Sequence, residues 1–150
     1  MCRITFQRVA LIKEYGKRYQ FDRDICSPDK AVQVFNDVLH LNESDVERFT
    51  AIYVNNKKQL VAVHTLTIGL IDCSLVSPAD VYKIALLTGA NGVIVAHNHP
   101  SGDPEPSRDD LCITQRLAKA GEILGVSLLD HIVIGTNTPD WISLAEQGYI

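Results

Sequence analysis

The run of apolar residues at 92–96, Gly-Val-Ile-Val-Ala, constrains the fold of this 150-residue chain more than any other sequence feature. An uninterrupted apolar run is typical of a strand buried on both faces, because a strand with one solvated face alternates apolar and polar residues. Such a strand lies inside a sheet whose two faces are both covered. We therefore expect helices on both sides of a central sheet.

Helix and strand signals alternate along the rest of the chain. Three helices are expected, from Ser27 through Leu39, from Ser77 to near Gly89, and from Ser107 to about Leu124. Strands are expected at 3–12, 17–21, 49–54, 59–68 and 126–134, with a last short helical turn at 141–145. The pattern predicts a single α/β domain, a mixed β-sheet flanked by helices. Within it, residues 1–26 would form an N-terminal β extension and residues 27–150 the main body.

Composition places the chain among ordinary globular proteins. Apolar residues make up 46% of it and charged residues 21%, which excludes a disordered tail and a disulfide-built mini-protein. No apolar run approaches the ~20 residues of a membrane helix. The first residues also lack the apolar stretch of a secretory signal. We therefore expect a cytoplasmic protein with no membrane partner.

The four cysteines, Cys2, Cys26, Cys73 and Cys112, form no C-x-x-C pair and are too sparse for a disulfide framework. In a cytoplasmic protein their thiols are expected to be reduced. Cys73 and Cys112 stand among apolar residues, so we expect them to pack as small apolar side chains.

The charge distribution bears on nucleic-acid binding. The net charge is −4 and the sequence pI is 5.7, whereas nucleic-acid-binding domains usually have a pI above ~9. Residues 1–23 do carry six basic side chains against two acidic ones, a local charge of +4. That strip could meet phosphate, but a solvated hairpin with charged outer faces explains it better.

The segment 97–110, His-Asn-His-Pro-Ser-Gly-Asp-Pro-Glu-Pro-Ser-Arg-Asp-Asp, carries the candidate chemistry. His97 and His99 stand two residues apart at the end of the buried strand, so side-chain alternation puts both imidazoles on one face. Asp110 lies in the first turn of the next helix, from which its carboxylate could reach that face. Two neutral imidazoles and one carboxylate suit a zinc ion (Zn²⁺) that keeps its fourth position for water.

These residues also have purely structural interpretations. Ser107 and Asp110 have the spacing of a capping box, in which they would only close a helix start. The two histidines could be a polar strand end. Since a carboxylate used as a free cap is not available as a ligand, the capping and metal-binding interpretations compete at Asp110.

The spacing His97-x-His99, seven residues, Ser107, two residues, Asp110 resembles the JAMM motif, H-x-H-x(7)-S-x(2)-D, of JAB/MPN-type zinc metalloproteases. The chain resembles the bacterial RadC-like branch of that family in the amino-acid sequence of residues 97–108 and of the flanking segments 90–96 and 129–135. The resemblance runs from about residue 27 to residue 150. It implies a JAB/MPN domain with a cytidine-deaminase-like architecture, in which the two histidines and Asp110 are zinc ligands and Ser107 helps to hold an oxyanion.

The resemblance also implies a general base. The upstream glutamate of the motif falls best on Glu47, with Glu43 as the alternative, although without the family either would be taken as a solvated acid. The implied activity is zinc-dependent hydrolysis of an amide by a peptidase or isopeptidase, with zinc-activated water, Glu47 as general base, and a protein or peptide substrate. His131 is left out of the site, because Asp130-His131 more simply belongs to a strand.

Two other functions remain open at this point. Longer RadC-like proteins carry a helix-hairpin-helix region ahead of the domain, so the chain could be a DNA-repair-associated accessory protein that binds DNA or repair partners without hydrolysis. About 26 residues precede the domain here, and the acidic pI counts against DNA. The fold could also serve as a metal-free scaffold, but retention of all the motif positions argues for chemistry.

Overall fold

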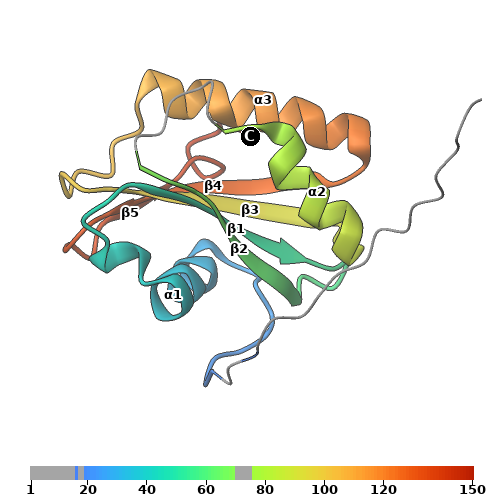
Figure 1. Cartoon of the computed structure of the whole chain (residues 1–150), viewed down its shortest axis with the longest axis horizontal. Helices are drawn as coiled ribbons and strands as arrows, with labels where there is room; N and C mark the ends of the chain where they lie inside the picture. Colours follow the sequence, from blue (N-terminus) through green and yellow to red (C-terminus); the bar gives the residue numbers. More distant parts are fainter. Residues whose placement is uncertain (1–15, 17–18, 70–75) are drawn as a thin grey trace, which may run out of the picture.

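The computed structural model of the chain describes residue 16 and residues 19–69 and 76–150 (Figure 1). Among these residues, five strands form one mixed sheet in the order β2-β1-β3-β4-β5. The elements in chain order are α1 (Pro28–Leu39), the 3-10 helix η1 (Leu41–Glu43), β1 (Arg48–Val54), β2 (Leu60–Ile68), α2 (Pro78–Thr88), β3 (Gly92–His99), α3 (Arg108–Leu124), β4 (Ser127–Gly135) and β5 (Trp141–Ser143). The predicted α/β domain with a mixed sheet flanked by helices is confirmed.

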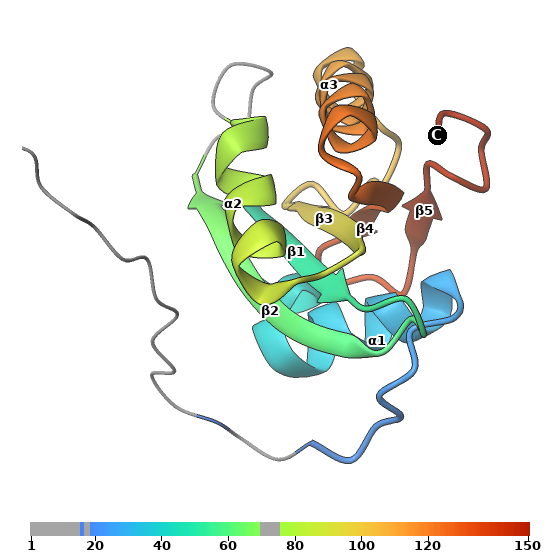
Figure 2. The same cartoon turned by 90° about the vertical axis from the view of Figure 1, so that its right-hand side faces the viewer.

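Helices cover the sheet from both sides, as Figures 1 and 2 show. On one face α2 and α3 pack with Tyr82 and Leu117 in the same apolar cluster as Val95. On the other face α1 packs with Phe35 in the same cluster as Ile94. Strand β3 is buried over its first seven residues, which confirms the prediction made from its apolar run. Odd-numbered residues of β3 therefore face α3, and even-numbered residues face α1.

The strand directions bring several chain ends to one edge of the sheet. β1 pairs antiparallel with β3, with Phe49 opposite His97, and β3 pairs parallel with β4. The carboxyl ends of β3 and β4 therefore lie beside the amino end of β1. The loop after β3 leads directly to the start of α3, so the first turn of α3 lies at the same edge (Figure 1).

The helix ends follow the predicted signals. Ser27 and Ser77 are N-cap residues with proline in the first turn, but neither serine side chain makes a capping hydrogen bond. The proline ring is compatible with the helix start, because the amide it lacks would have no intrahelical partner there. Gly89 and Gly125 end α2 and α3 with positive φ values of 67° and 70°. None of the helices in the described ranges is long and apolar enough to span a membrane.

The predicted helical turn at 141–145 is wrong. Trp141–Ser143 is strand β5, which pairs antiparallel with β4, and Ser143 lies opposite Ile132. The outer edge of β4 needs backbone partners for its amides and carbonyls, and β5 supplies them. A three-residue strand is too short to show a period in the sequence.

The predicted N-terminal β extension lies mostly outside the described residues. The strand expected at 3–12 lies entirely outside them. Of the strand expected at 17–21, residues 19–21 are described and are not in a strand. Asp24 forms an isolated bridge with Gln59, so the chain meets the β1–β2 hairpin just before α1 begins.

The prediction for Cys112 is wrong. Its side chain is exposed on α3 and is disulfide-bonded rather than packed as a reduced thiol. The buried residues of this helix are Asp110, Ile113, Thr114, Leu117 and Gly121, and the helical period places residue 112 outside that stripe. Cys73 lies outside the described residues, and Cys26 is an exposed free thiol.

Candidate metal centre

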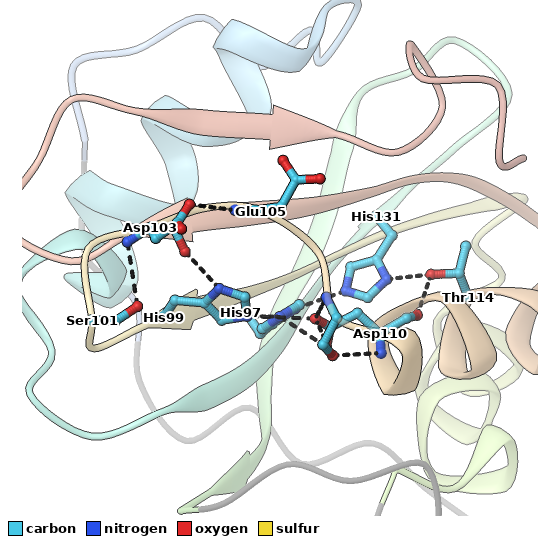
Figure 3. A network of polar contacts seen from close by, with 9 residues as sticks. His97, His99, Ser101, Asp103, Glu105, Asp110, Thr114 and His131 are labelled. Carbon is cyan, nitrogen blue, oxygen red and sulfur yellow. Dashed lines mark hydrogen bonds and ion pairs between the residues drawn. The ribbon is translucent and has the colours of Figure 1, made fainter.

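The residues of the predicted motif meet at the edge of the sheet where β3 ends and α3 begins. His97 Nε2 lies 3.1 Å from Asp110 Oδ1, and His99 Nε2 lies 3.5 Å from Asp110 Oδ2. The two Nε2 atoms are 3.0 Å apart (Figure 3). The three side chains are 0%, 17% and 5% exposed for His97, His99 and Asp110, so the group is nearly dry but can be reached from the His99 side.

The hydrogen bonds of His99 determine its neutral tautomer. Its Nδ1 lies 2.7 Å from the carbonyl oxygen of Asp103. A carbonyl only accepts, so Nδ1 carries the proton. The lone pair of the neutral ring is then on Nε2, which faces His97 and Asp110.

A chain of three buried groups determines the tautomer of His97. The Thr114 hydroxyl donates to the Asp110 carbonyl at 2.7 Å, so it must accept from His131 Nδ1 at 2.6 Å. His131 Nε2 is then an acceptor, and His97 Nδ1, at 2.8 Å, donates to it. The lone pair of neutral His97 is therefore also on Nε2. Figure 3 shows the His131 ring between His97 and Thr114.

These protonation states fit a cation. Two unprotonated nitrogens 3.0 Å apart repel each other and the carboxylate beside them unless positive charge lies between them. Two imidazoles and one carboxylate are a donor set that zinc takes in proteins. The alternative to a cation is a proton: the hydrogen bond to Asp110 raises the pKa of His99. Burial alone would raise the pKa of Asp110. When protons sit on the facing Nε2 atoms, hydrogen bonds from His97 and His99, together with the one from Ser107, hold that pKa well below its usual value.

Of the two candidate bases, Glu47 is the one beside the histidines. Its carboxylate and the ligand nitrogens of His97 and His99 all lie within 4.8 Å of one another, and the side chain is half-buried. Glu43 is in η1 instead, where its exposed carboxylate lies 3.9 Å from His40 Nδ1. The geometry thus brings Glu47, and not Glu43, to the motif.

Asp110 caps α3 and also faces the two histidines. The capping box is present: Asp110 Oδ2 accepts from the Ser107 amide at 2.7 Å, and Ser107 Oγ accepts from the Asp110 amide at 3.1 Å. The Ser107 hydroxyl also lies 2.7 Å from Oδ2. Oδ1 meanwhile faces His97 Nε2. The cap therefore holds Oδ2, which also faces His99, and leaves Oδ1 turned toward His97.

A loop anchor keeps the histidines in place. The His99 carbonyl accepts from the amides of both Gly102 and Thr136 at 3.0 Å. Gly135 has no room for a side chain, since a Cβ there would lie 2.3 Å from the Gly102 carbonyl oxygen. The loop after β3 is therefore packed directly on the end of β4.

Comparison with known proteins shows the family to which the chain is related. Residues 25–149 match the family model of the RadC-like JAB domain. This chain belongs to that family. A UPF0758 protein of Geobacillus thermodenitrificans is 46% identical over 136 residues, covering 91% of this chain and 57% of the relative. A UPF0758 protein of Methanococcoides burtonii is 36% identical over 148 residues, covering 95% and 63%. The chain thus spans less than two thirds of these relatives' length.

Three residues beside the motif were not assigned to the site from the sequence: His131 was considered and left out, and Thr114 and Asn98 were not considered. His131 and Thr114 set the His97 tautomer, and Asn98 binds the segment that carries Glu47. A weak signal existed for two of them. Thr114 stands one helical turn after Asp110, and His131 is a polar residue inside an apolar strand. Asn98 gave no signal beyond its place between the two histidines.

Proposed function

We propose that this chain is a zinc-dependent hydrolase of the JAMM type that cleaves amide bonds, as a peptidase or isopeptidase. The observation that carries the proposal is the convergence of His97, His99 and Asp110 at one nearly dry point with the Glu47 carboxylate beside it. His97, His99 and Asp110 would hold the ion. Bound there, zinc would supply a Lewis acid and lower the pKa of water toward ~7.

Glu47 is the proposed general base. A half-buried carboxylate within 4.8 Å of the histidine nitrogens is close enough to accept a proton from attacking water. The same carboxyl group would then pass that proton to the leaving amine. General acid–base catalysis of this kind is typically worth about 10²–10⁴ in rate.

Ser107 is the proposed oxyanion donor. Its hydroxyl is 2.7 Å from Asp110 Oδ2 and lies at the exposed start of α3. Turned toward the substrate, the same hydroxyl would donate to the oxygen that gains charge as the carbonyl is attacked. One such donor is worth about 2.7–4 kcal/mol where it has been measured.

The described residues offer no comparable support for DNA binding. The exposed residues next to the site include Asp103 and Glu105 in the loop after β3, and Asp109 and Arg108 in the first turn of α3. Carboxylates at the mouth of the site repel phosphate and suit a cation. The DNA-associated alternative therefore stays a prediction from the family resemblance.

The first test is the metal content of the protein purified without added metal or a histidine tag. We expect near one zinc per chain, and loss of that zinc in His99→Ala, since the variant keeps only two of the three ligands. Glu47→Gln should keep the zinc. Absence of zinc after reconstitution at neutral pH would overturn the proposal.

The second test is turnover. The zinc-loaded protein is incubated with a mixed pool of unfolded polypeptides and isopeptide-linked conjugates, and newly formed amino groups are identified by mass spectrometry. We expect cleavage by the wild-type protein and a loss of about 10²–10⁴ in Glu47→Gln. Equal cleavage by Glu47→Gln would contradict the assigned base.

A further inference from the structure

Asn98 lies between the two histidines of β3 but faces the other side of the sheet. It is fully buried, at 0% exposed. Alternation along the strand turns its side chain away from the imidazoles and toward the segment that precedes β1. A buried amide costs free energy unless its donors and acceptors are paired, so its partners identify its role.

The Asn98 amide binds the backbone on both sides of residue 47. Its Oδ1 accepts from the Arg48 amide at 2.9 Å. Its Nδ2 donates to the carbonyl oxygens of Ser44 at 2.9 Å and Val46 at 3.2 Å, and to Thr136 Oγ1 at 3.0 Å. The Arg48 amide only donates and the two carbonyls only accept, which determines the orientation of the side chain.

No regular secondary structure holds this segment. The β1–β3 ladder ends at the pair Phe49 and His97, and residues 44–47 are in neither helix nor strand. The Glu47 carbonyl accepts from the Gly69 amide at 2.8 Å. Asn98 therefore supplies, with one side chain, the contacts that a further ladder residue of β3 would have supplied with its backbone.

We propose that Asn98 is the positioning residue for Glu47. Its hydrogen bonds fix the position of the Glu47 backbone relative to β3, the strand that carries His97 and His99. The distance between the Glu47 carboxylate and the ligand nitrogens is thereby kept constant. Asn98 itself touches neither the ligands nor the reacting atoms. The catalytic consequence rests on the proposed function, whereas the positioning itself does not.

The expected consequence is large for a residue outside the chemistry. A displacement of about 1 Å in a reacting group can cost about 10² in rate. Asn98→Ala leaves Glu47, the three ligands and Ser107 in the sequence but removes the contacts on both sides of residue 47. We therefore expect kcat to fall about 10²-fold while KM and metal stoichiometry stay unchanged.

The experiment compares three variants of the full chain. Asn98→Ala removes the positioning contacts, and Glu47→Gln removes the carboxylate. Ile94→Ala is the matched control. Ile94 is buried on the same strand and the same face as Asn98, but its apolar side chain forms no hydrogen bond with residues 44–48. The readouts are the Co²⁺ absorption spectrum and affinity, amide hydrogen exchange over 44–48, and turnover of a peptide found to be cleaved.

The first two readouts need no substrate. In Asn98→Ala we expect Co²⁺ to bind with wild-type affinity, the spectrum to shift as it does in Glu47→Gln, and the 44–48 amides to exchange faster. Ile94→Ala should change neither the Co²⁺ spectrum nor the Co²⁺ affinity, and any faster exchange that follows from its lower stability should extend over the whole described fold instead of being confined to 44–48. With a substrate, adding Asn98→Ala to Glu47→Gln should cause no further loss, because the two changes act through one carboxylate.

Two results would overturn the inference. One is unchanged exchange over 44–48 with an unchanged Co²⁺ spectrum in Asn98→Ala. The other is a loss of Co²⁺ affinity in Asn98→Ala, which would make the residue part of the metal site itself. If the wild-type protein binds no Co²⁺ or cleaves nothing, the proposed function fails, and the exchange comparison between Asn98→Ala and Ile94→Ala still decides the positioning role.

Discussion

The two ends of strand β3 are both largely buried, with only His99 partly exposed, but they are stabilised differently. Its first five residues, 92–96, are apolar and pack into the clusters on both faces. Its last three, His97, Asn98 and His99, replace packing by hydrogen bonds to α3, β4 and the segment before β1. Apolar packing tolerates a small shift of its neighbours, whereas a hydrogen bond at 3 Å does not. The polar end therefore defines the positions of the chemical groups, and the apolar end supplies the stability.

The largest effect that tests this division is expected for Ile94→Ala at the apolar end. Removing the buried side chain should lower the free energy of unfolding by about 2–5 kcal/mol, because transfer and cavity costs add. Zinc affinity at the folded protein should not change. Denaturant unfolding of the metal-free form and a zinc titration measure the two quantities. A parallel fall in zinc affinity would contradict the claim that the apolar end of β3 supplies stability without positioning the metal ligands.

Thr114→Val tests the polar end of β3 by removing the hydroxyl that sets the tautomers of His131 and His97. Without the hydroxyl, His131 Nδ1 loses its acceptor, and nothing then favours the ring forms that leave His97 Nε2 unprotonated. We expect zinc affinity to fall about 10–100-fold, as is usual when a group behind a metal ligand is removed.

Thr50→Val is the matched control for that variant. The Thr50 hydroxyl is also buried, and it donates to the Ala96 carbonyl at 3.0 Å without touching either histidine. This control should lose some stability and keep its zinc affinity. Equal losses of zinc affinity in the two variants would show that the hydrogen-bond chain from Thr114 through His131 to His97 does not determine zinc affinity.

The pH dependence of the metal-free protein sharpens the comparison further. Burial lowers the pKa of His131, so the unfolded chain binds its proton first and stability falls as pH drops below ~6.5. The slope should be at most about 1.4 kcal/mol per pH unit. His99 acts oppositely: its raised pKa adds stability that is complete below ~6.5 and is lost as pH rises through the folded value.

Stability of the metal-free protein should therefore pass through a maximum near pH 6.5. Thermal or denaturant unfolding at several pH values between 5.5 and 8 measures it, at constant ionic strength. A stability that rises steadily toward pH 5.5 would contradict the buried neutral state of His131.

The smallest effect is expected for Tyr82→Phe, far from the polar end. The Tyr82 hydroxyl donates to the Leu117 carbonyl at 2.8 Å and joins α2 to α3. Burial raises its pKa to about 12. Losing this one neutral hydrogen bond should cost about 0.5–1.5 kcal/mol and leave zinc affinity unchanged. A change in zinc affinity here would mean that the α2–α3 contact also sets the position of Asp110.

Much of the fold and of the motif could be predicted from local patterns. The apolar run at 92–96 predicted the central strand, and the proline and glycine signals predicted the three helices, because each reports on backbone geometry within a few residues. The motif likewise predicted that His97, His99 and Asp110 would converge, because strand alternation and one helical turn suffice to bring them together. Strand β5 depends on its pairing with β4, which no local period reports. The exposure of Cys112 was missed although the helical period of α3 places it outside the buried stripe.

The sequence by itself determined the layered α/β architecture, the family and the histidine–aspartate motif, since these follow from short-range periods and spacing. Only the tertiary structure decided that Asp110 caps α3 with one oxygen while it faces His97 with the other. It also decided that Glu47 rather than Glu43 stands at the histidines, and that His131 and Asn98 hold the site. The physical reason is that the contacts of Asp110 with His97, of Glu47 with the histidines, and of His131 and Asn98 with their partners join segments up to 54 residues apart, and their geometry exists only after the sheet has formed.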